Sequence, residues 1–141
     1  MSEDQHHHLT IAKALLRDHE GWRDTPYKCT AGKLTICYGH NLEDNPLTPD
    51  VGEYILHSDV MECMGDLQTF PWWDDLSENR KAAMIDMRFC LGPNRFRKFK
   101  KMLVALDQKN YPWAAREVLD SLFASQTGRR AEKIASLLED G

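Results

Sequence analysis

The chain has 141 residues, of which 42% are hydrophobic and 28% are charged, and its formal net charge is −4. This length is enough to enclose one hydrophobic core, so we expect a single domain over residues 1–141, with residues 1–8 as a disordered leader. No stretch approaches the roughly 18 uninterrupted apolar residues of a membrane span, and the first residues lack the basic and apolar regions of a signal peptide. We therefore expect a chain that is made in a cytoplasm and has no stable membrane insertion.

Charge is distributed unevenly along the chain. Residues 1–70 carry 5 basic and 12 acidic side chains, whereas residues 71–141 carry 13 basic and 10 acidic ones. Much of the basic excess lies in residues 95–101, which form either a solvated helix face or a surface for an anionic polymer. A nucleic-acid-binding helical module would use this stretch with Phe96 and Phe99 interleaved. The acidic net charge and the helical spacing of the two Phe residues argue against that alternative.

The first part of the chain predicts one helix followed by a small sheet. Apolar residues recur at helical spacing from Leu9 to Leu16, so we expect a helix to about His19, with Glu20 at its exit. Residues 22–41 then change to short segments rich in Thr, Tyr and Ile, with a turn at residues 31–32. This pattern predicts a small antiparallel sheet. The tract at residues 6–8, three histidines, could bind metal, but it precedes the fold and is better explained as part of the leader.

The rest of the chain predicts only helices. Thr48 followed by Pro49 is a strong helix start, and that helix should end near residues 70–71. Ser77 should cap the next helix, which Gly92 and Pro93 should stop. Three further helices are expected, over about residues 96–106, 112–123 and 129–138. One helix, a small sheet and then helices predict an α+β domain.

One segment carries a more specific pattern. It reads His19-Glu-Gly-Trp-Arg-Asp-Thr-Pro-Tyr-Lys-Cys-Thr-Ala-Gly-Lys-Leu-Thr-Ile-Cys-Tyr-Gly-His-Asn41, and it resembles the catalytic segment of the phage lysozymes, glycoside hydrolase family 24. The shared spacing is a Glu, eight residues, an Asp or Cys, five residues and a Thr. The resemblance continues through residues 71–73, 89–92 and 126–131. It implies a lysozyme-like fold in which a small β-sheet lobe and a larger helical lobe enclose a cleft.

The resemblance implies three catalytic residues. Cleavage of a glycosidic bond needs an acid for the leaving oxygen and a group on the opposite face. Glu20 would be the acid, although a Glu at a helix end is usually only a solvated charge. Cys29 would act as a thiolate, holding negative charge toward the sugar or orienting water, and its alternative is a small buried thiol. Thr35 would position the attacking water with its hydroxyl, although a Thr in a strand is otherwise ordinary.

The resemblance also implies supporting and substrate-binding residues. Arg130 matches a family arginine that pairs with the acid and tunes its pKa, the alternative being an exposed arginine near a helix start. His40 and Asp59 match an ion pair that joins the sheet lobe to the long helix. Sugar contacts are expected at four positions: Asn41, Phe89, Met102 and Glu117.

The four cysteines match no zinc-site spacing, so we expect reduced thiols and no metal. The resemblance implies an enzyme that needs no cofactor. Cys37 and Cys90 replace the residues usual in relatives at positions that border the cleft. They are either a disulfide pair between the lobes or two unrelated substitutions. The distance between their Cα atoms decides, since a bridge requires it to be within about 7 Å.

The implied function is that of an endolysin that hydrolyses the β-1,4 bond between N-acetylmuramic acid and N-acetylglucosamine in peptidoglycan. We expect a monomer that collects in the host cytoplasm, reaches the periplasm after holin-mediated release and does not bind nucleic acid. The alternative within the same fold is a murein-binding relative that is catalytically dead or a transglycosylase.

Overall fold

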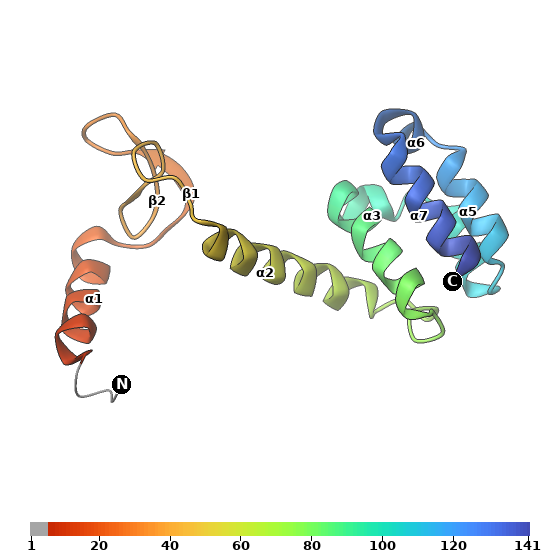
Figure 1. The fold of residues 1–141 in the computed structure, drawn as a ribbon, viewed down its shortest axis with the longest axis horizontal. Coiled ribbons are helices and arrows are strands. Elements are labelled where there is room, and N and C mark those ends of the chain that lie inside the picture. The colour runs from red at the N-terminus through yellow and green to blue at the C-terminus, as the bar shows by residue number, and fades with distance from the viewer. Residues whose placement is uncertain (1–5) are drawn as a thin grey trace. The chain divides into compact units, whose positions relative to one another are not determined.

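A computed structural model describes residues 6–141 (Figure 1). In this part of the chain, seven helices accompany one three-stranded antiparallel sheet, so the predicted α+β class is confirmed. The elements are α1 His7–Glu20, β1 Arg23–Lys28, β2 Leu34–Cys37, β3 His40–Asn41, α2 Pro49–Leu67, α3 Glu78–Phe96, α4 Lys100–Asp107, α5 Tyr111–Leu119, α6 Leu122–Thr127 and α7 Arg129–Asp140. The described residues contain no helix that is both long and apolar enough to cross a membrane.

The chain divides into two compact units, Met1–Gly52 and Glu53–Gly141. The first holds α1 and the sheet, and the second holds most of α2 and all later helices. Because α1 begins at His7, the last two residues of the predicted leader are helical. The rest of the expected leader, apart from His6, lies outside the described residues.

In the first unit, α1 ends where the sequence predicts. Its last residue is Glu20, and Gly21 follows with φ 71°, a left-handed conformation that glycine adopts without steric cost. The Gly21 N–H donates a 3.1 Å hydrogen bond to the carbonyl of Arg17. This glycine turns the chain out of the helix and toward β1, so Glu20 is held at the junction between helix and sheet.

The predicted sheet is present, with strand order β1-β2-β3 and antiparallel pairing throughout. Thr35 lies on the central strand, opposite Tyr27 of β1 and Asn41 of β3. The pairing of β1 with β2 is irregular between Arg23 and Tyr27, the stretch that contains Pro26. Proline has no N–H to donate to a ladder, which is consistent with its place in an edge strand.

The second unit begins within α2 and is built of helices around one core. Thr48 and Pro49 start α2 as predicted, and the Thr48 carbonyl accepts a 3.0 Å hydrogen bond from the N–H of Gly52. Ser77 caps α3, because its Oγ accepts a 3.2 Å hydrogen bond from the N–H of Arg80. Both starts follow the preference of helices for a hydroxyl residue or a proline in the first turn.

Gly92 and Pro93 were expected to stop the helix that Ser77 caps, and the helical conformation is interrupted there. Gly92 leaves the helical conformation, with φ 79° and ψ 170°, but helical turns resume at once and continue to Phe96. The reason is that Pro93 fits the first turn of a new helical segment, where no N–H is needed. The result is a kink in α3 and a separate start for α4 at Lys100.

A second break was missed by the sequence analysis. The expected helix over residues 112–123 is divided into α5 and α6 at Asp120 and Ser121. The Ser121 hydroxyl donates to the carbonyl of Val118 at 2.6 Å and accepts from the N–H of Ala124 at 3.2 Å. Ser121 therefore ends one helix and caps the next.

The core of the second unit packs α7 against α3, α5 and α6 (Figure 1). Ile134 and Leu138 of α7 are buried on one face, at the spacing of one helical turn. Arg80 of α3 contacts two other helices. Its Nε donates a 2.7 Å hydrogen bond to the Leu138 carbonyl of α7, and its guanidinium lies 3.7 Å from the ring centre of Tyr111 of α5. The fully buried large side chains of this unit are Phe96, Leu67, Met84, Met87, Met102, Leu106, Ile134, Leu138 and Val118.

Candidate active site

Glu20 is positioned by the end of α1 and by the sheet. The helix brings it to the junction, and its carboxyl lies against Gly39 in the turn between β2 and β3. Gly39 has φ 69° and no side chain, so the carboxyl can approach its backbone closely. The predicted acid is thus held against the strand pair that carries Thr35.

Cys29 follows β1 directly and begins the turn into β2. Its N–H donates to the Lys33 carbonyl at 2.9 Å, and its own carbonyl accepts from the N–H of Gly32 at 2.8 Å. The pKa of the Cys29 thiol is lowered from its ordinary value, first by a backbone hydrogen bond from Lys33 and then by one from Ala31, while desolvation opposes the shift. Turn amides that point at the sulfur favour the thiolate over the thiol.

Thr35 is buried on β2 beside this turn. Its Oγ1 donates a 2.9 Å hydrogen bond to the carbonyl of Lys33, and the hydroxyl also contributes to lowering the pKa of the Cys29 thiol. A hydroxyl has one proton, so Thr35 donates either to Lys33 or to the Cys29 thiolate. Thr35 therefore lies close enough to Cys29 for its hydroxyl to favour the thiolate.

His40 and Asn41 form β3, and both side chains hold the loop that follows. The Oδ1 of Asn41 accepts from the N–H groups of Glu43 and Asp44, each at 3.1 Å. The Nε2 of His40 lies 2.8 Å from the carbonyl oxygen of Asn45. The sugar contact of Asn41 and the pairing of His40 with Asp59, which lies on α2 in the second unit, stay predictions.

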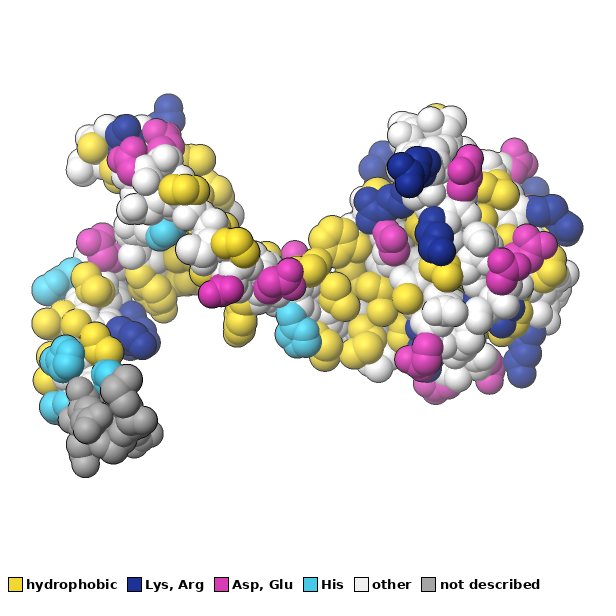
Figure 2. All heavy atoms as spheres, in the orientation of Figure 1, with side chains coloured by type: hydrophobic (Ala, Val, Ile, Leu, Met, Phe, Trp, Pro, Cys, Tyr) yellow, Lys and Arg dark blue, Asp and Glu magenta, His cyan; other side chains and the backbone are white. Residues whose placement is uncertain are grey.

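In the second unit, Phe89 and Arg130 line one apolar pocket of about 460 Å³. Figure 2 shows hydrophobic side chains gathered over α2 and α3, the helices that supply the rest of this pocket. Arg130 binds Asp86 of α3, its Nε donating to Oδ1 at 2.6 Å. This partner was not anticipated from the sequence, and the pairing of Arg130 with Glu20 stays a prediction.

Met102 and Glu117 line a second pocket, of about 470 Å³, together with Lys98 of the segment between α3 and α4 and with Lys100 and Lys101 at the start of α4. Glu117 accepts a 3.0 Å hydrogen bond from the indole Nε1 of Trp113. Met102 is fully buried in the core, so it forms part of the pocket wall and offers no exposed side chain. The sugar contacts of both residues stay predictions.

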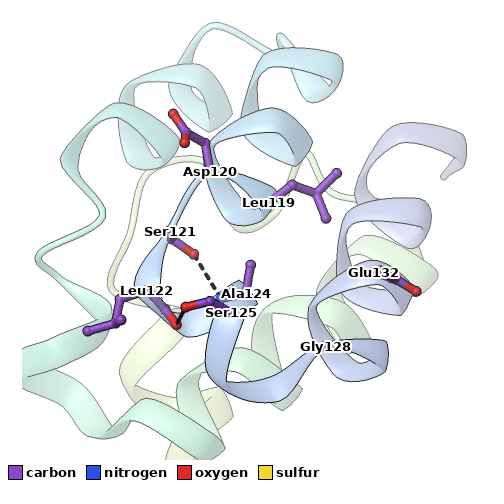
Figure 3. Close-up of a pocket in the computed structure, with 8 residues that line it drawn as sticks. All are labelled: Leu119, Asp120, Ser121, Leu122, Ala124, Ser125, Gly128 and Glu132. Atoms are coloured by element: carbon purple, nitrogen blue, oxygen red, sulfur yellow. Dashed lines mark hydrogen bonds between the residues drawn. The ribbon is translucent and has the colours of Figure 1, made fainter.

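A third pocket, of about 660 Å³, lies where α5, α6 and α7 meet (Figure 3). Asp120, Ser121 and Ser125 supply polar groups to it, and Glu132 lies across from them on α7. The sequence analysis assigned no role to these residues. The signal that was available is the capping serine at position 121, which marks the helix break that opens this pocket.

All four cysteines are free thiols in the structure, including Cys37 in the first unit and Cys90 on α3 in the second. Within residues 6–141, no cluster of three or more His, Cys, Asp or Glu side chains could hold a metal ion.

Comparison with known proteins identifies the family. A family model described as phage lysozyme matches residues 17–137, which include every element from the last turn of α1 to the last turn of α7. The chain belongs to the phage lysozyme family. Its α+β architecture is therefore lysozyme-like, as the sequence resemblance implied, and membership of the family supports lysozyme-like peptidoglycan hydrolysis.

Individual relatives agree with the family. Probable T4-type lysozyme 2 of Dictyostelium discoideum is 26% identical over 163 residues, covering 94% of this chain and 96% of that protein. Endolysin of Acyrthosiphon pisum secondary endosymbiont phage 1 is 28% identical over 123 residues, covering 82% of this chain and 80% of that protein. Pre-baseplate central spike protein Gp5 of Enterobacteria phage T4 is 26% identical over 167 residues, covering 98% of this chain but 29% of that longer protein.

Proposed function

We propose that the chain is an endolysin of glycoside hydrolase family 24, which hydrolyses the β-1,4 bond between N-acetylmuramic acid and N-acetylglucosamine in peptidoglycan and causes lysis of the host cell. One observation carries this proposal. Within one small unit of a phage lysozyme family chain, a carboxyl at the exit of α1 accompanies a thiol of lowered pKa and a buried hydroxyl at the adjoining β-turn. Glycoside hydrolysis needs an acid and a group on the opposite face of the sugar, and the carboxyl would supply the first while the thiol and hydroxyl supply the second.

Glu20, Cys29 and Thr35 each have a separate role in the proposed reaction. Glu20, protonated, gives its proton to the glycosidic oxygen as the bond between that oxygen and the anomeric carbon breaks. A water held by the Thr35 hydroxyl attacks the anomeric carbon from the opposite face and loses a proton to the Cys29 thiolate. Glu20 ends ionised and Cys29 ends protonated, so one proton exchanged through solvent restores both. Attack from the opposite face inverts the anomeric centre.

The basic stretch at residues 95–101 supports a wall polymer over nucleic acid as the partner. Phe96 is fully buried, with its ring 5.9 Å from that of Phe70, and the ring of Phe99 lies 6.4 Å from that of Phe123. Both rings pack against other aromatic side chains of the protein. Proteins that bind single-stranded nucleic acids instead stack the bases on exposed aromatic side chains. We therefore include in the proposal that the chain does not bind nucleic acid.

The remaining parts of the proposal rest on the family. The chain would act as a monomer on peptidoglycan, without a cofactor. It would collect in the host cytoplasm and reach the periplasm when a holin opens the inner membrane.

The test uses purified chain and purified peptidoglycan, with loss of turbidity as the rate and mass spectrometry of the products. Glu20→Gln should lower the rate by about 100-fold or more, because a positioned acid is worth roughly 10²- to 10⁴-fold. Asp18→Asn, which neutralises a carboxylate on the same helix, is the matched control and should leave the rate unchanged.

The products separate the proposed function from its alternatives. Reducing sugar ends support hydrolysis, whereas anhydro ends would show a transglycosylase. Binding of peptidoglycan without cleavage by the parent chain would show a catalytically dead relative, and a Glu20→Gln rate within a few-fold of the parent would remove Glu20 from the site.

A further inference from the structure

Gly39 is fitted to the carboxyl of Glu20. A Cβ built on Gly39 would lie 2.5 Å from Oε2, 2.7 Å from Cδ and 3.1 Å from Cγ of Glu20. These three atoms are the nearest neighbours of that position, and all belong to one side chain. The carboxyl of Glu20 therefore occupies the space that a side chain at position 39 would need.

Other glycines with positive φ provide a contrast. Gly21, Gly32, Gly92 and Gly128 have φ between 55° and 79°, and a Cβ built on any of them meets no atom within 4 Å. At these positions, backbone conformation alone favours glycine. Gly39, with φ 69°, has this conformation and the close approach of a carboxyl as well.

We propose that Gly39 is a positioning residue for Glu20: the absence of a side chain in the β2–β3 turn fixes where the carboxyl of the acid lies. This inference rests on the proposed function, in which Glu20 protonates the leaving oxygen. The carboxyl is the far end of a flexible side chain, so it can move aside when a Cβ is added, with little effect on folding. Catalysis is more sensitive than folding to this movement, because a misplacement of about 1 Å at a reacting group can lower a rate by about 10²-fold.

Gly39→Ala is the informative variant. We expect kcat to fall by roughly 10- to 100-fold while KM changes by less than about 3-fold, since the change moves the acid and leaves the sugar contacts in place. The melting temperature should fall no further than in Gly32→Ala, which adds the same methyl group at a positive φ in the same unit without a steric contact. Gly92→Ala, the equivalent change in the second unit, should keep the parent rate.

Two measurements test whether Glu20 transmits the effect. In a Glu20→Gln background, Gly39→Ala should cause no further fall in the residual rate, because the acid is already lost. NMR of the ¹³C-labelled carboxyl of Glu20 should show a changed chemical shift in Gly39→Ala but not in Gly32→Ala. A Glu20 signal identical to that of the parent, or a kcat equal to that of Gly92→Ala, would overturn the inference.

The outcome also separates this inference from the proposed function. If Glu20→Gln keeps full activity while Gly39→Ala still shifts the Glu20 carboxyl signal, the proposed function fails and the positioning by Gly39 stands. If Gly39→Ala does not fold, the double variant Glu20→Ala/Gly39→Ala separates the two causes. Recovery of the fold supports the contact with Glu20. A double variant that stays unfolded shows that the loss of stability comes from the backbone conformation, and this result overturns the inference.

Discussion

The carboxylate of Asp66 near the end of α2 binds Arg88 of α3, with 2.7 Å between Oδ2 and the Nε of the arginine. Arg88 is only 7% exposed. The same carboxylate also accepts from Arg97 at 2.5 Å, on the side nearer to solvent. A buried guanidinium is stable only when its charge is paired, so this carboxylate allows Arg88 to lie inside the second unit.

Asp66→Asn should lower the free energy of unfolding by about 3 kcal/mol, because it leaves the Arg88 charge buried without a counterion. Urea unfolding followed by circular dichroism measures the change. Asp75→Asn is the control, since it removes an exposed pair with Lys109 at 3.9 Å that should contribute less than about 1 kcal/mol. Equal losses in the two variants would contradict a special role for Asp66.

The same carboxylate predicts a pH dependence. The hydrogen bond from Arg97 is the largest cause that lowers the pKa of Asp66, from 3.8 to about 2. Because the pKa in the folded state lies below that in the unfolded state, the stabilisation is fully present above about pH 4 and is lost as the pH falls toward 2. Stability of the parent should therefore drop by about 2 kcal/mol more than that of Asp66→Asn over this interval, as measured by urea unfolding at each pH.

Cys37 lies in a left-handed conformation, with φ 61°, at the end of β2. Such a conformation costs a residue with a side chain roughly 1–2 kcal/mol, and glycine avoids the cost. We expect Cys37→Gly to be more stable than Cys37→Ala by about 1 kcal/mol, because both variants lose the sulfur and only the first relieves the backbone.

Both variants lack the thiol at position 37, so a bridge to Cys90 contributes to neither. Amide hydrogen exchange in β2 and β3 reports on the first unit directly, and the melting temperature reports on the whole chain. If Cys37→Gly is less protected than Cys37→Ala, the backbone at position 37 is not strained.

The helix starts and the sheet were predictable because their signals are local. Ser77 accepts a hydrogen bond from an N–H of the first turn, and Pro49 has no N–H that needs a partner, whatever the rest of the chain does. The strand alternation in residues 22–41 is equally local. The interruption at Gly92 was predicted as well, but the short helical segment after it was not, because Pro93 suits a helix start as well as a helix stop.

The sequence predicted the positions of the candidate site residues only where the order of helices and strands along the chain determines them. The sequence order alone brings Cys29 and Thr35 to one β-turn, and it puts Glu20 at the helix exit. The pairing of Arg130 with Asp86 and the burial of Met102 depend on how α3, α4 and α7 pack, and no sequence spacing encodes them. The close approach of the Glu20 carboxyl to Gly39 could likewise not be predicted from the sequence, because a glycine in a turn is usually explained by its backbone conformation alone.

Cys29 provides the sharpest test of the mechanism, because a thiolate and a carboxylate can each accept a proton or hold negative charge at the same place. Cys29→Asp should therefore keep substantial activity in the turbidity assay. Cys29→Ala should lose most of it, and so should Cys29→Ser, since a serine hydroxyl is not ionised near neutral pH whereas the pKa of this thiol is lowered by the turn amides. Melting curves of the three variants exclude unfolding as the cause of any loss.

Alkylation then tests whether Cys29, and none of the other three thiols, is the one that activity requires. Iodoacetamide should inactivate the parent faster than Cys29→Asp, and the two proteins are a matched pair because both retain Cys37, Cys63 and Cys90. Peptidoglycan fragments should slow inactivation of the parent by covering the sulfur. If Cys29 is instead a packed thiol, alanine and serine should be tolerated, and aspartate should lower the melting temperature because its charge is costly to desolvate. A fully active Cys29→Ala would remove the thiol from the mechanism and leave the attacking water to Thr35 and the acid step to Glu20.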